Sequence, residues 1–356
     1  MVGPSARAQG PVPDAPARGV PAHASGPEAL PRLLVSIPAL NEERTVGQIV
    51  RGVPREIPGV GVVEVLVVDD GSADATAQVA EEAGARVIRH PSRRGVGAAF
   101  HTALSYGIDR GVDLIVSIDA DGQFDPADIP ALLAPVRSGE ADLATASRFI
   151  DPALVPEMPA VKRWGNRMMS RLISRLAGQR FHDVSCGMRC YSRRAVLELH
   201  LLGRFTYTQE VILNLAFKGL RIVEVPLRVR GEREFGESRV AGSLWRYGLL
   251  TGQIIFRCYR DYHPLRLFGG IALLLLLPAL ALAGFLLGHY LQTGAFSPHK
   301  WAGFTALGLS LLALLVLQVG MVGDMLARHR AYLEEVLVRQ RGGGSPGGPP
   351  EPGPGE

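Results

Sequence analysis

Residues 114–123 read Leu-Ile-Val-Ser-Ile-Asp-Ala-Asp-Gly-Gln, and this stretch decides the fold class. Its first five residues form a mostly apolar run of the length of a buried strand, and the run ends at two carboxylates. Similar runs recur along the chain, with stretches of helical periodicity between them. The strand-like runs are residues 33–37, 63–68, 86–89, 114–118 and 143–146, and the helix-like stretches are residues 45–51, 73–83, 98–110 and 127–136. This alternation predicts an α/β domain with a mostly parallel sheet covered by helices on both faces.

Ligands of such sheets bind beyond the carboxyl ends of the strands, and polar motifs of this chain follow those ends. Residues 38–43 read Pro-Ala-Leu-Asn-Glu-Glu after the first run, and residues 68–72 read Val-Asp-Asp-Gly-Ser after the second. A carboxylate in this place can accept hydrogen bonds from a nucleotide base or ribose. Asp70 or Ser72 could equally cap the next helix, and for the motif taken alone the capping interpretation is favoured.

The carboxylates of Asp119 and Asp121 follow the fourth run. Strand alternation would point them to the same side of the sheet. Two neighbouring carboxylates repel each other unless a cation lies between them. A divalent metal carrying a diphosphate resolves the repulsion, because Mg²⁺ favours a few carboxylates together with phosphate oxygens. The alternative is a pair of solvated turn residues.

Further motifs combine arginines with carboxylates. Arg148 follows the fifth run, where its guanidinium can fork onto a phosphate. Residues 183–189 read Asp-Val-Ser-Cys-Gly-Met-Arg, residues 208–210 read Thr-Gln-Glu, and residues 233–239 read Arg-Glu-Phe-Gly-Glu-Ser-Arg. Taken singly, each motif could form a surface ion pair, which is the commoner fate of Arg and Glu.

The composition excludes several classes of protein. Hydrophobic residues make up 47% and charged residues 20%, so the chain is not wholly disordered, collagen-like or a coiled coil. The formal net charge of +4 gives no strong reason to expect nucleic-acid binding, and we predict none. Residues 1–31 are rich in Pro, Ala and Gly, and residues 342–356 are rich in Gly and Pro, so both ends are predicted to be disordered.

Two uncharged apolar blocks lie near the C-terminus, at residues 267–288 and 301–323. As helices they each span roughly 33 Å, enough for a bilayer core of about 30 Å. Arginines flank the outer ends of the pair, whereas the connecting loop has only His289, His299 and Lys300 as basic residues. Cationic flanks stay in the cytoplasm, so we predict a transmembrane hairpin in the cytoplasmic membrane, with both termini inside. The alternative is a pair of helices buried in a soluble domain.

Two segments have the pattern of basic amphipathic helices. In residues 161–177 arginines recur every four residues opposite Trp164 and aliphatic side chains, and residues 243–260 show a similar division. Such helices beside a transmembrane hairpin are typical of a membrane surface. Ordinary packing against the soluble domain is the alternative.

Taken together and in order, these motifs resemble those of family 2 glycosyltransferases. They most resemble the branch of polyprenyl- and dolichyl-phosphate mannosyltransferases and bactoprenol glucosyltransferases. The resemblance covers residues 32–260, and the hairpin to about residue 327 is similar to that of bacterial members with two spans. It implies a GT-A fold, which is Rossmann-like, a nucleotide-sugar donor, Mg²⁺ or Mn²⁺, and transfer of a hexose to a polyprenyl phosphate.

The resemblance also implies a donor-binding set. Its members are Pro38, Leu40, Glu42, Val68, Asp70, Asp119, Ala120, Asp121, Gln123, Arg148, Arg233 and Arg239. Asp119, Asp121 and Gln123 match the metal and diphosphate motif. Two positions depart from the family pattern. Leu40 stands where an aromatic residue is common, and Arg239 stands where Lys is common, which keeps the charge but changes its geometry.

The remaining assignments concern catalysis and the acceptor. Asp119, Asp121 and Arg148 match the catalytic positions, and Arg148 is also expected to meet the acceptor phosphate. Lys162 or Arg163, at the start of the first amphipathic helix, is expected to meet that phosphate too. Asp183 and Glu210 are supporting residues that would orient arginines or sugar hydroxyls.

A phosphate acceptor is already an anion at neutral pH, so it needs no strong base to attack the anomeric carbon. The resemblance therefore implies a single displacement with inversion, from a donor of the GDP-mannose or UDP-glucose type, in which positioning and charge stabilisation dominate. Two alternatives stay open. A transferase acting on another membrane lipid, such as a diacylglycerol, would need a base, with Glu210 or Asp183 as the candidate. A membrane scaffold with a degenerate domain would need no chemistry.

The predicted organisation is a GT-A domain over residues 32–242, an interfacial helix over 243–266, a hairpin over 267–326 and a cytoplasmic helix end over 327–341. The hairpin also offers a surface for association between copies. Residues 32–160 hold 11 basic and 19 acidic residues, a net −8, whereas residues 161–260 hold 19 and 7, a net +12. This division fits an enzyme that joins a metal-bound nucleotide sugar to an anionic lipid at a membrane surface.

Overall fold

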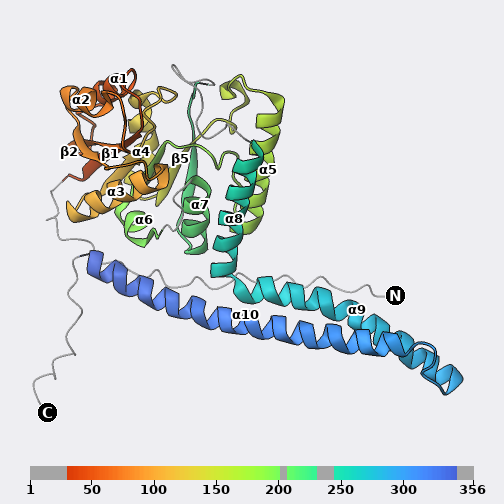
Figure 1. Ribbon diagram of the computed structural model, residues 1–356. Coiled ribbons are helices and arrows are strands. Elements are labelled where there is room, and N and C mark those ends of the chain that lie inside the picture. The colour runs from red at the N-terminus through yellow and green to blue at the C-terminus, as the bar shows by residue number, and fades with distance from the viewer. Residues whose placement is uncertain (1–29, 201–206, 231–243, 343–356) are drawn as a thin grey trace, which may run out of the picture.

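A seven-stranded sheet forms the centre of the chain's α/β unit, and a long helical hairpin extends from it (Figure 1). The computed structural model describes residues 30–200, 207–230 and 244–342. The strands are β1 (Arg32–Ala39), β2 (Val62–Asp69), β3 (Arg86–Arg89), β4 (Leu114–Ser117), β5 (Leu143–Ser147), β6 (Arg189–Ser192) and β7 (Ile222–Pro226). The helices are α1 (Val46–Gly52), α2 (Thr76–Glu82), α3 (Val96–Asp109), α4 (Ile129–Arg137), α5 (Ala160–Ala177), α6 (Arg193–Glu198), α7 (Thr208–Phe217), α8 (Leu244–Tyr262), α9 (Pro264–Thr293) and α10 (Lys300–Arg341).

The sheet is mostly parallel, as predicted, but it is mixed. Its strand order is β3-β2-β1-β4-β6-β5-β7. Strand β6 runs antiparallel between β4 and β5, and the other four pairings are parallel. The carboxyl ends of β1, β2 and β4 therefore meet at one edge, which is where such sheets bind ligands. This order and covering correspond to a Rossmann-like GT-A fold.

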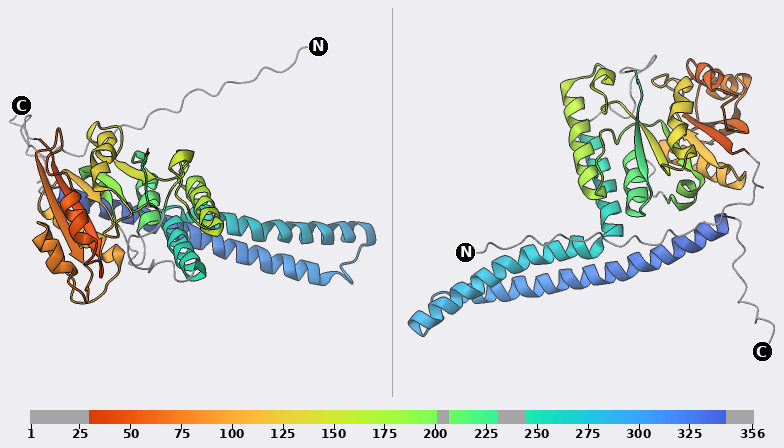
Figure 2. Two further views of the ribbon diagram at one scale, coloured as in Figure 1. Left: turned by 90° about the horizontal axis from the view of Figure 1, so that it is seen from above. Right: turned by 180° about the vertical axis from the view of Figure 1, so that it is seen from behind.

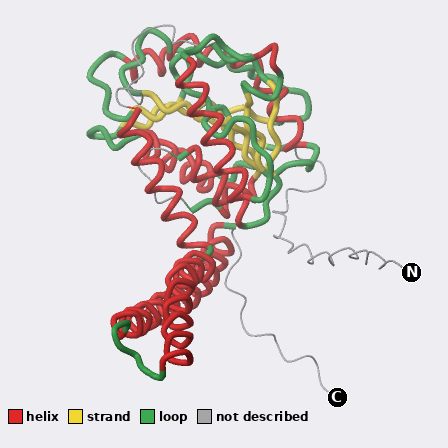
Figure 3. Tube along the Cα trace, turned by 90° about the vertical axis from the view of Figure 1, so that its right-hand side faces the viewer, coloured by secondary structure: helices red, strands yellow, loops and turns green. Residues whose placement is uncertain are grey.

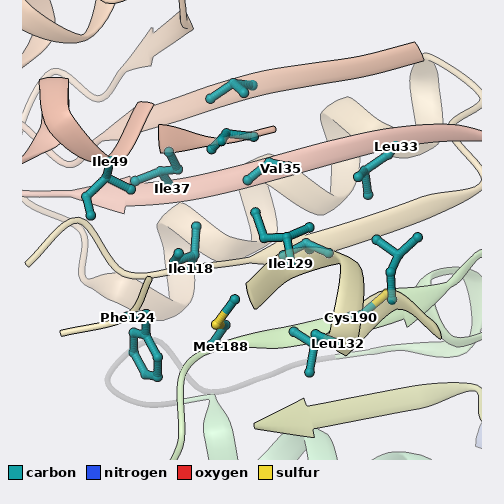
Figure 4. Close-up of a cluster of buried hydrophobic side chains, with 14 of the residues drawn as sticks. Leu33, Val35, Ile37, Ile49, Ile118, Phe124, Ile129, Leu132, Met188 and Cys190 are labelled. Atoms are coloured by element: carbon teal, nitrogen blue, oxygen red, sulfur yellow. The ribbon is translucent and has the colours of Figure 1, made fainter. Parts of the chain in front are cut away.

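Both faces of the sheet are buried, which explains why the strand runs are continuously apolar. On one face, Leu33, Val35 and Ile37 of β1 pack with side chains of α1 and α4, and Figure 4 shows this cluster. On the other face, Leu34 belongs to a second cluster with α3, α6 and α7. A central strand with polar residues on one side would leave one of these helix layers without a core.

Four elements between residues 180 and 230 were not predicted. They are β6, α6, α7 and β7; β6 and α6 are short, and polar residues interrupt the apolar runs of α7 and β7. The described strand β4 also ends at Ser117, so Asp119 and Asp121 lie in the turn that follows it. The strand-alternation argument for these two side chains was therefore wrong, because neither residue is in a strand.

Helices α9 and α10 are long and apolar enough to cross a membrane. Only 11% and 17% of their most apolar windows are buried, unlike the core helices of a soluble domain. The predicted blocks lie within these helices. Helix α10 is 42 residues long, so it extends past its apolar block to Arg341 and runs beneath the α/β unit (Figure 2). Helix α8 ends at Tyr262 and α9 begins at Pro264, so the amphipathic helix stops before residue 266.

Helix α10 packs on α9 through small residues. Ala302, Ala306, Ala313 and Gly320 are its buried positions. A Cβ on Gly320 would lie 2.9 Å from the Cβ of Phe268, so the glycine permits close approach of the two helices. Figures 1 and 2 show the two helices running side by side, and Figure 3 shows the hairpin from its loop end.

The amphipathic helices have one packed side and one open side. In α5, Ile173 is buried in the second core cluster, whereas Val161, Trp164, Met168 and Leu172 are exposed. In α8, Ile255 and Cys258 are buried and Leu249 and Phe256 are exposed. Each helix thus packs on the α/β unit and also presents apolar side chains outward, so packing accounts for one side of each helix and the membrane-surface interpretation of the other side stays a prediction.

Candidate active site

The loops after β1 and β2 are bound to each other. The backbone N–H of Asn41 donates to Ser72 Oγ (2.8 Å), and the N–H of Ala73 donates to Asn41 Oδ1 (2.8 Å). Asn41 has a φ of 47°, a left-handed conformation that Asn tolerates better than most residues. The predicted residues Pro38, Leu40 and Glu42 lie on this loop or at its start, and Leu40 and Glu42 are half-buried.

Asp70 holds a third loop against these two. Its carboxylate accepts hydrogen bonds from His90 Nδ1 (2.7 Å) and from the backbone N–H groups of Arg94 (2.9 Å) and Gly95 (2.7 Å). Gly95 is the residue before α3, so Asp70 does cap a helix. The helix is α3, however, and not the next helix in the chain. Val68 is fully buried two residues earlier.

A cavity of about 300 Å³ opens beside Asp70. It is lined by Gly71, Ser72, Arg89, His90 and Pro91. The ring of His90 is 4% exposed, and its Nε2 lies 3.0 Å from Thr102 Oγ1 on α3. His90 thus joins the edge of the sheet to α3. The sequence offered one signal for it, its place directly after the third strand run.

The acidic turn after β4 is partly buried. Ala120 and Asp121 are buried, while Asp119 and Gln123 are half-buried. Asp121 Oδ1 accepts the backbone N–H of Gln123 (3.1 Å). The carboxylate of Asp119 lies against Gly187, where any Cβ would collide with it. Burial, followed by the negative charge of Asp119, raises the pKa of Tyr207, which places that carboxylate near the buried phenol.

The donor set of this turn fits Mg²⁺ or Mn²⁺. Among the described residues, no group of three or more His, Cys, Asp or Glu side chains could hold a metal ion. The turn offers two carboxylates and the Gln123 amide, and Mg²⁺ characteristically takes one or two carboxylates and completes its shell with phosphate oxygens and water. Gly187 leaves the Asp119 oxygens room that any larger residue would fill.

The turn is also connected to the end of β7. Arg230 N donates to the carbonyl of Gln123 (2.9 Å), and Gln123 Nε2 donates to the carbonyl of Arg230 (3.2 Å). The chain described by the structure stops at Arg230 and resumes at Leu244. The predicted residues Arg233 and Arg239 lie outside the described residues.

Arg148 is held by Asp183 in a two-pronged ion pair. Arg148 Nε lies 2.6 Å from Asp183 Oδ2, and Nη2 lies 2.9 Å from Oδ1. Arg148 also donates to Ser185 Oγ (3.1 Å). Burial alone would raise the pKa of the fully buried Asp183, but the charge and hydrogen bonds of Arg148 lower it below its ordinary value. Asp183 therefore orients an arginine, one of the two roles expected of it.

Glu224 on β7 holds the residues next to this pair in place. Its carboxylate accepts the backbone N–H groups of His182 (2.8 Å) and Asp183 (2.7 Å) and the hydroxyl of Ser147 (2.9 Å). It thereby fixes both the residue before Arg148 and the residue that binds Arg148. The sequence analysis missed Glu224. A carboxylate inside the otherwise apolar run of β7 was the available signal.

The start of α5 lies next to Arg148. Ser185 Oγ, which accepts from Arg148, donates to Asn166 Oδ1 of α5 (3.2 Å). Lys162 and Arg163 lie about one helical turn before Asn166, and both are exposed. Ser185 therefore connects the second turn of α5 to Arg148, and Lys162 and Arg163 precede that turn.

A fully buried guanidinium organises the same loop. Arg189 donates to the carbonyls of Val184 (3.2 Å), Cys186 (3.0 Å) and Thr208 (2.7 Å). It joins the loop to the start of α7, where Glu210 is 7% exposed. Arg189 was quoted within its motif but given no role. Its charge keeps a polar loop ordered inside the unit, because each carbonyl gains a charge-assisted hydrogen bond.

The comparisons with known proteins point to one family. The Glycosyl transferase family 2 model matches residues 34–199. A polyprenol monophosphomannose synthase of Mycolicibacterium smegmatis is 32% identical over 226 residues, covering 60% of this chain and 82% of that protein. An undecaprenyl-phosphate mannosyltransferase of Micrococcus luteus is 30% identical over 229 residues, covering 60% of this chain and 89% of that protein.

Solved structures agree at the level of the fold. Glucosyl-3-phosphoglycerate synthase from Mycobacterium tuberculosis aligns with a TM-score of 0.51 and 24% identity, covering 65% of this chain and 80% of that one. The alignments cover 82% and 89% of the two sequence relatives, so these relatives establish the family, whereas the solved structure establishes the fold alone. The protein is a glycosyltransferase with a GT-A domain, and its chain belongs to glycosyltransferase family 2.

Proposed function

We propose that this enzyme transfers a hexose from a nucleotide sugar to a polyprenyl phosphate at the cytoplasmic face of a membrane. One observation carries the proposal. The loop of residues 183–187 binds Arg148 at its first residue and abuts Asp119 at its last. A cation and one of the proposed metal carboxylates, Asp119, thus contact the same five residues, so two phosphate-bearing substrates could be fixed relative to each other.

The donor would bind at the edge where β1, β2 and β4 end. The cavity beside Asp70 and the loop of Leu40 and Glu42 would take the nucleoside. Asp119, Asp121 and Gln123 would hold Mg²⁺ or Mn²⁺, which when bound supplies positive charge for the leaving diphosphate. The M. tuberculosis glucosyl-3-phosphoglycerate synthase has been solved with Mn²⁺ or Mg²⁺ and UDP, which supports this expectation. Arg233 and Arg239 are proposed as further donor contacts.

The acceptor would bind at Arg148 and the first turn of α5. A phosphate oxygen of the acceptor forms a bond to the anomeric carbon while the bond to the donor diphosphate breaks. The diphosphate leaves with the electron pair, and no proton has to move. Arg148, fixed by Asp183, offsets the repulsion between the two anionic substrates. A single displacement of this kind inverts the anomeric configuration.

The state of Asp183 disfavours an alcohol acceptor. A diacylglycerol hydroxyl would need a base. Both oxygens of Asp183 bind Arg148, however. Burial acts to raise the pKa of Asp183, but the charge and hydrogen bonds of Arg148 outweigh it and lower the pKa. Glu210, buried at the start of α7, is then the remaining candidate base. A non-catalytic scaffold is not needed to explain the chain, because it belongs to an enzyme family and keeps an ordered arginine clamp.

The membrane placement is part of the proposal. Helices α9 and α10 would span the bilayer as a hairpin, because their exposed faces are apolar and their cationic flanks lie at one end. The exposed apolar side chains of α5 and α8 would lie at the membrane surface. We propose domain limits of 32–242 for the GT-A domain, 243–266 for an interfacial segment that contains α8 and the first residues of α9, 267–326 for the hairpin and 327–341 for a cytoplasmic end of α10.

A donor panel tests the function. Membranes containing the enzyme receive GDP-mannose, UDP-glucose or UDP-GlcNAc with a polyprenyl phosphate, and lipid products are identified by mass. We expect one donor to add a single hexose to the polyprenyl phosphate in the presence of Mg²⁺ or Mn²⁺. A glycosylated diacylglycerol, or no polyprenyl product with any donor, would contradict the proposal. An Asp125→Asn variant is a matched control, because Asp125 is an exposed cap on the same loop.

A further inference from the structure

The chain reverses direction after α5 and returns along the same helix. Gly178 follows the last residue of α5 with a φ of 71°, a left-handed conformation that favours glycine. Three polar contacts then join helix and returning chain in antiparallel order: Ser174 to Phe181, Ser170 to His182 and Asn166 to Ser185. The three helix residues lie four positions apart, so one side of α5 contacts the loop that binds Arg148.

Two of these contacts bind the backbone of the returning chain. The N–H of Phe181 donates to Ser174 Oγ (2.8 Å), and Ser170 Oγ donates to the carbonyl of His182 (2.9 Å). Ser170 is buried, and so is the side chain of Phe181, which belongs to the second core cluster. Water therefore cannot easily replace a partner that is lost here, and each hydroxyl holds its backbone group in place.

Strand β7 binds the same stretch of chain. Glu224 accepts the backbone N–H groups of His182 and Asp183, and Gln179 Nε2 donates to the carbonyl of Ile222 (2.7 Å). Residues 181–183 are thus hydrogen-bonded both to α5 and to β7. We call these three residues the bridge segment.

The bridge segment ends at the residue that holds Arg148. Asp183 is its last residue, and its carboxylate makes the two-pronged ion pair with the guanidinium. The backbone N–H of Arg148 also donates to Asp183 Oδ2 (3.2 Å). Because the Arg148 side chain is only 15% exposed, the guanidinium has little freedom outside this pair. Its position therefore follows the position of the bridge segment.

We propose that Ser170 and Ser174 are positioning residues for the acceptor phosphate. By binding the bridge segment they set the place at which Asp183 holds Arg148, so α5 tunes the affinity for the acceptor without touching it through these serines. A charge-assisted hydrogen bond to phosphate depends on distance and direction, and a displaced guanidinium loses both. The inference rests on the proposed role of Arg148 at that phosphate.

Removing each hydroxyl tests the inference by separating the two substrates. For Ser170→Ala and Ser174→Ala we expect the KM for polyprenyl phosphate to rise about fivefold or more, with the donor KM unchanged within about twofold. Ser174→Thr, which keeps a hydroxyl, should recover part of the acceptor affinity. Equal increases in both KM values, or no increase in either, would overturn the inference.

Ser192 provides a matched control. Like Ser174 it is half-buried and accepts a backbone N–H, that of Ala195 at the start of α6 (3.1 Å). Ser192→Ala therefore loses a hydrogen bond of the same kind, and a helix cap with it, outside the bridge segment. We expect the ratio of acceptor KM to donor KM to stay at the wild-type value. A shift as large as that of Ser174→Ala would overturn the inference, because general destabilisation would then explain both.

A double variant tests whether the serine acts through the arginine. Ser170→Ala should raise the acceptor KM in the wild-type background but add less than about twofold in Arg148→Lys, because the two-pronged pair is already lost there. Effects that multiply independently would overturn the route through Arg148.

Hydrogen exchange separates the inference from the proposed function. In Ser170→Ala and Ser174→Ala the backbone N–H groups of the bridge segment should exchange faster than in the wild type, whereas Ser192→Ala should leave them unchanged. Unchanged exchange in both alanine variants would overturn the inference, whichever lipid accepts the sugar. An unchanged acceptor KM in Arg148→Lys would instead contradict the proposed function, and exchange would still report whether α5 holds the bridge segment.

Discussion

Lys218 at the end of α7 and Glu334 on α10 form an ion pair with 2.8 Å between Nζ and Oε2, and their side chains are only 12% and 14% exposed. Arg330 approaches the same carboxylate, with its Nε 2.7 Å from Oε1. Helix α7 begins at the motif that contains Glu210, so this pair joins the C-terminal part of α10 to a helix that starts at that motif. Among the described residues, the hairpin is therefore attached to the catalytic unit through α8, through this ion pair and through Arg341, whose Nη1 lies 3.4 Å from His200 Nε2.

Breaking this pair should destabilise the protein strongly. We expect Lys218→Met to cost about 3 kcal/mol of unfolding free energy, because it leaves a largely buried carboxylate with one cation fewer. The measurement is a denaturation curve in detergent, with Glu334→Gln and the double variant completing a cycle. The exposed pair of Arg339 and Glu335 is the control, and its removal should cost less than about 1 kcal/mol. Equal costs for the two pairs would show that Lys218 and Glu334 do not attach the hairpin.

Asp121→Asn should abolish metal-dependent transfer while the protein stays folded. The substitution removes a charge but keeps an oxygen for the Gln123 N–H. We expect the affinity for Mn²⁺ in the presence of nucleoside diphosphate to fall at least about tenfold, measured by magnetic resonance of the ion. The control variant Asp125→Asn changes an exposed residue of the same loop, so it should leave both the transfer activity and the affinity for Mn²⁺ unchanged. Full activity of Asp121→Asn would contradict the proposal that Asp121 binds the metal.

Arg148→Lys should raise the KM for polyprenyl phosphate more than the KM for the nucleotide sugar. Lysine keeps the charge but cannot make the two-pronged contact with Asp183, so the cation loses its fixed position. We expect an increase of about tenfold or more in the acceptor KM, measured in mixed micelles. A change confined to the donor KM would show that Arg148 serves the donor alone.

Asp183→Asn should weaken the fold in a pH-dependent way. The pKa of Asp183 is lowered from 3.8, so its ionised form stabilises the folded protein above that value and the stabilisation is lost as the pH falls through the folded-state pKa. The difference in unfolding free energy between wild type and Asp183→Asn should be constant from about pH 7 to 5. It should shrink below pH 3.8. A difference that grows on acidification would contradict the ion pair.

His90→Leu should affect the donor side of the reaction. It removes both ring contacts that connect Asp70 to Thr102, so the loop before α3 loses a support next to the cavity. We expect the donor KM to rise severalfold with little change in the acceptor KM. His90→Gln, which can still donate to Asp70, should recover part of the loss. Equal changes in both constants would indicate a general loss of structure.

Most of the strands that the sequence predicted are continuously apolar because helices cover both of their faces. The runs of β1, β2, β4 and β5 differ from the observed strands by a few residues. The run of residues 86–89 coincides with β3, although this edge strand has an exposed arginine at each end and half-buried residues between them. Strand β6 gave no such signal. Its sequence is Arg-Cys-Tyr-Ser, and it is a strand because β4 and β5 leave an antiparallel position between them. Such pairing depends on tertiary structure and leaves no local pattern.

The motifs of the site were predicted, but their contacts were not. Arg148 and Asp183 were recognised as separate motifs, yet their ion pair joins residues 35 positions apart. Asp70 was expected beside a nucleoside or as a cap of the next helix, and it caps α3 through Gly95. Glu224 escaped notice because two of its hydrogen bonds come from backbone N–H groups, which nearly every residue carries, and its side-chain partners Ser147 and His182 lie far away in the sequence. A sequence shows which groups are chemically capable, whereas the fold decides which of them meet.

The uninterrupted α10 makes the enzyme sensitive to chain length in a particular way. One residue inserted between Gly323 and Arg330 would turn every later side chain by about 100°, so Glu334 would no longer face Lys218. Seven inserted residues would restore the facing to within about 20° but would move the ion pair by about 10 Å along the axis. Chimeras that exchange the hairpin between relatives should therefore work only when the junction preserves both the rotation and the height of α10.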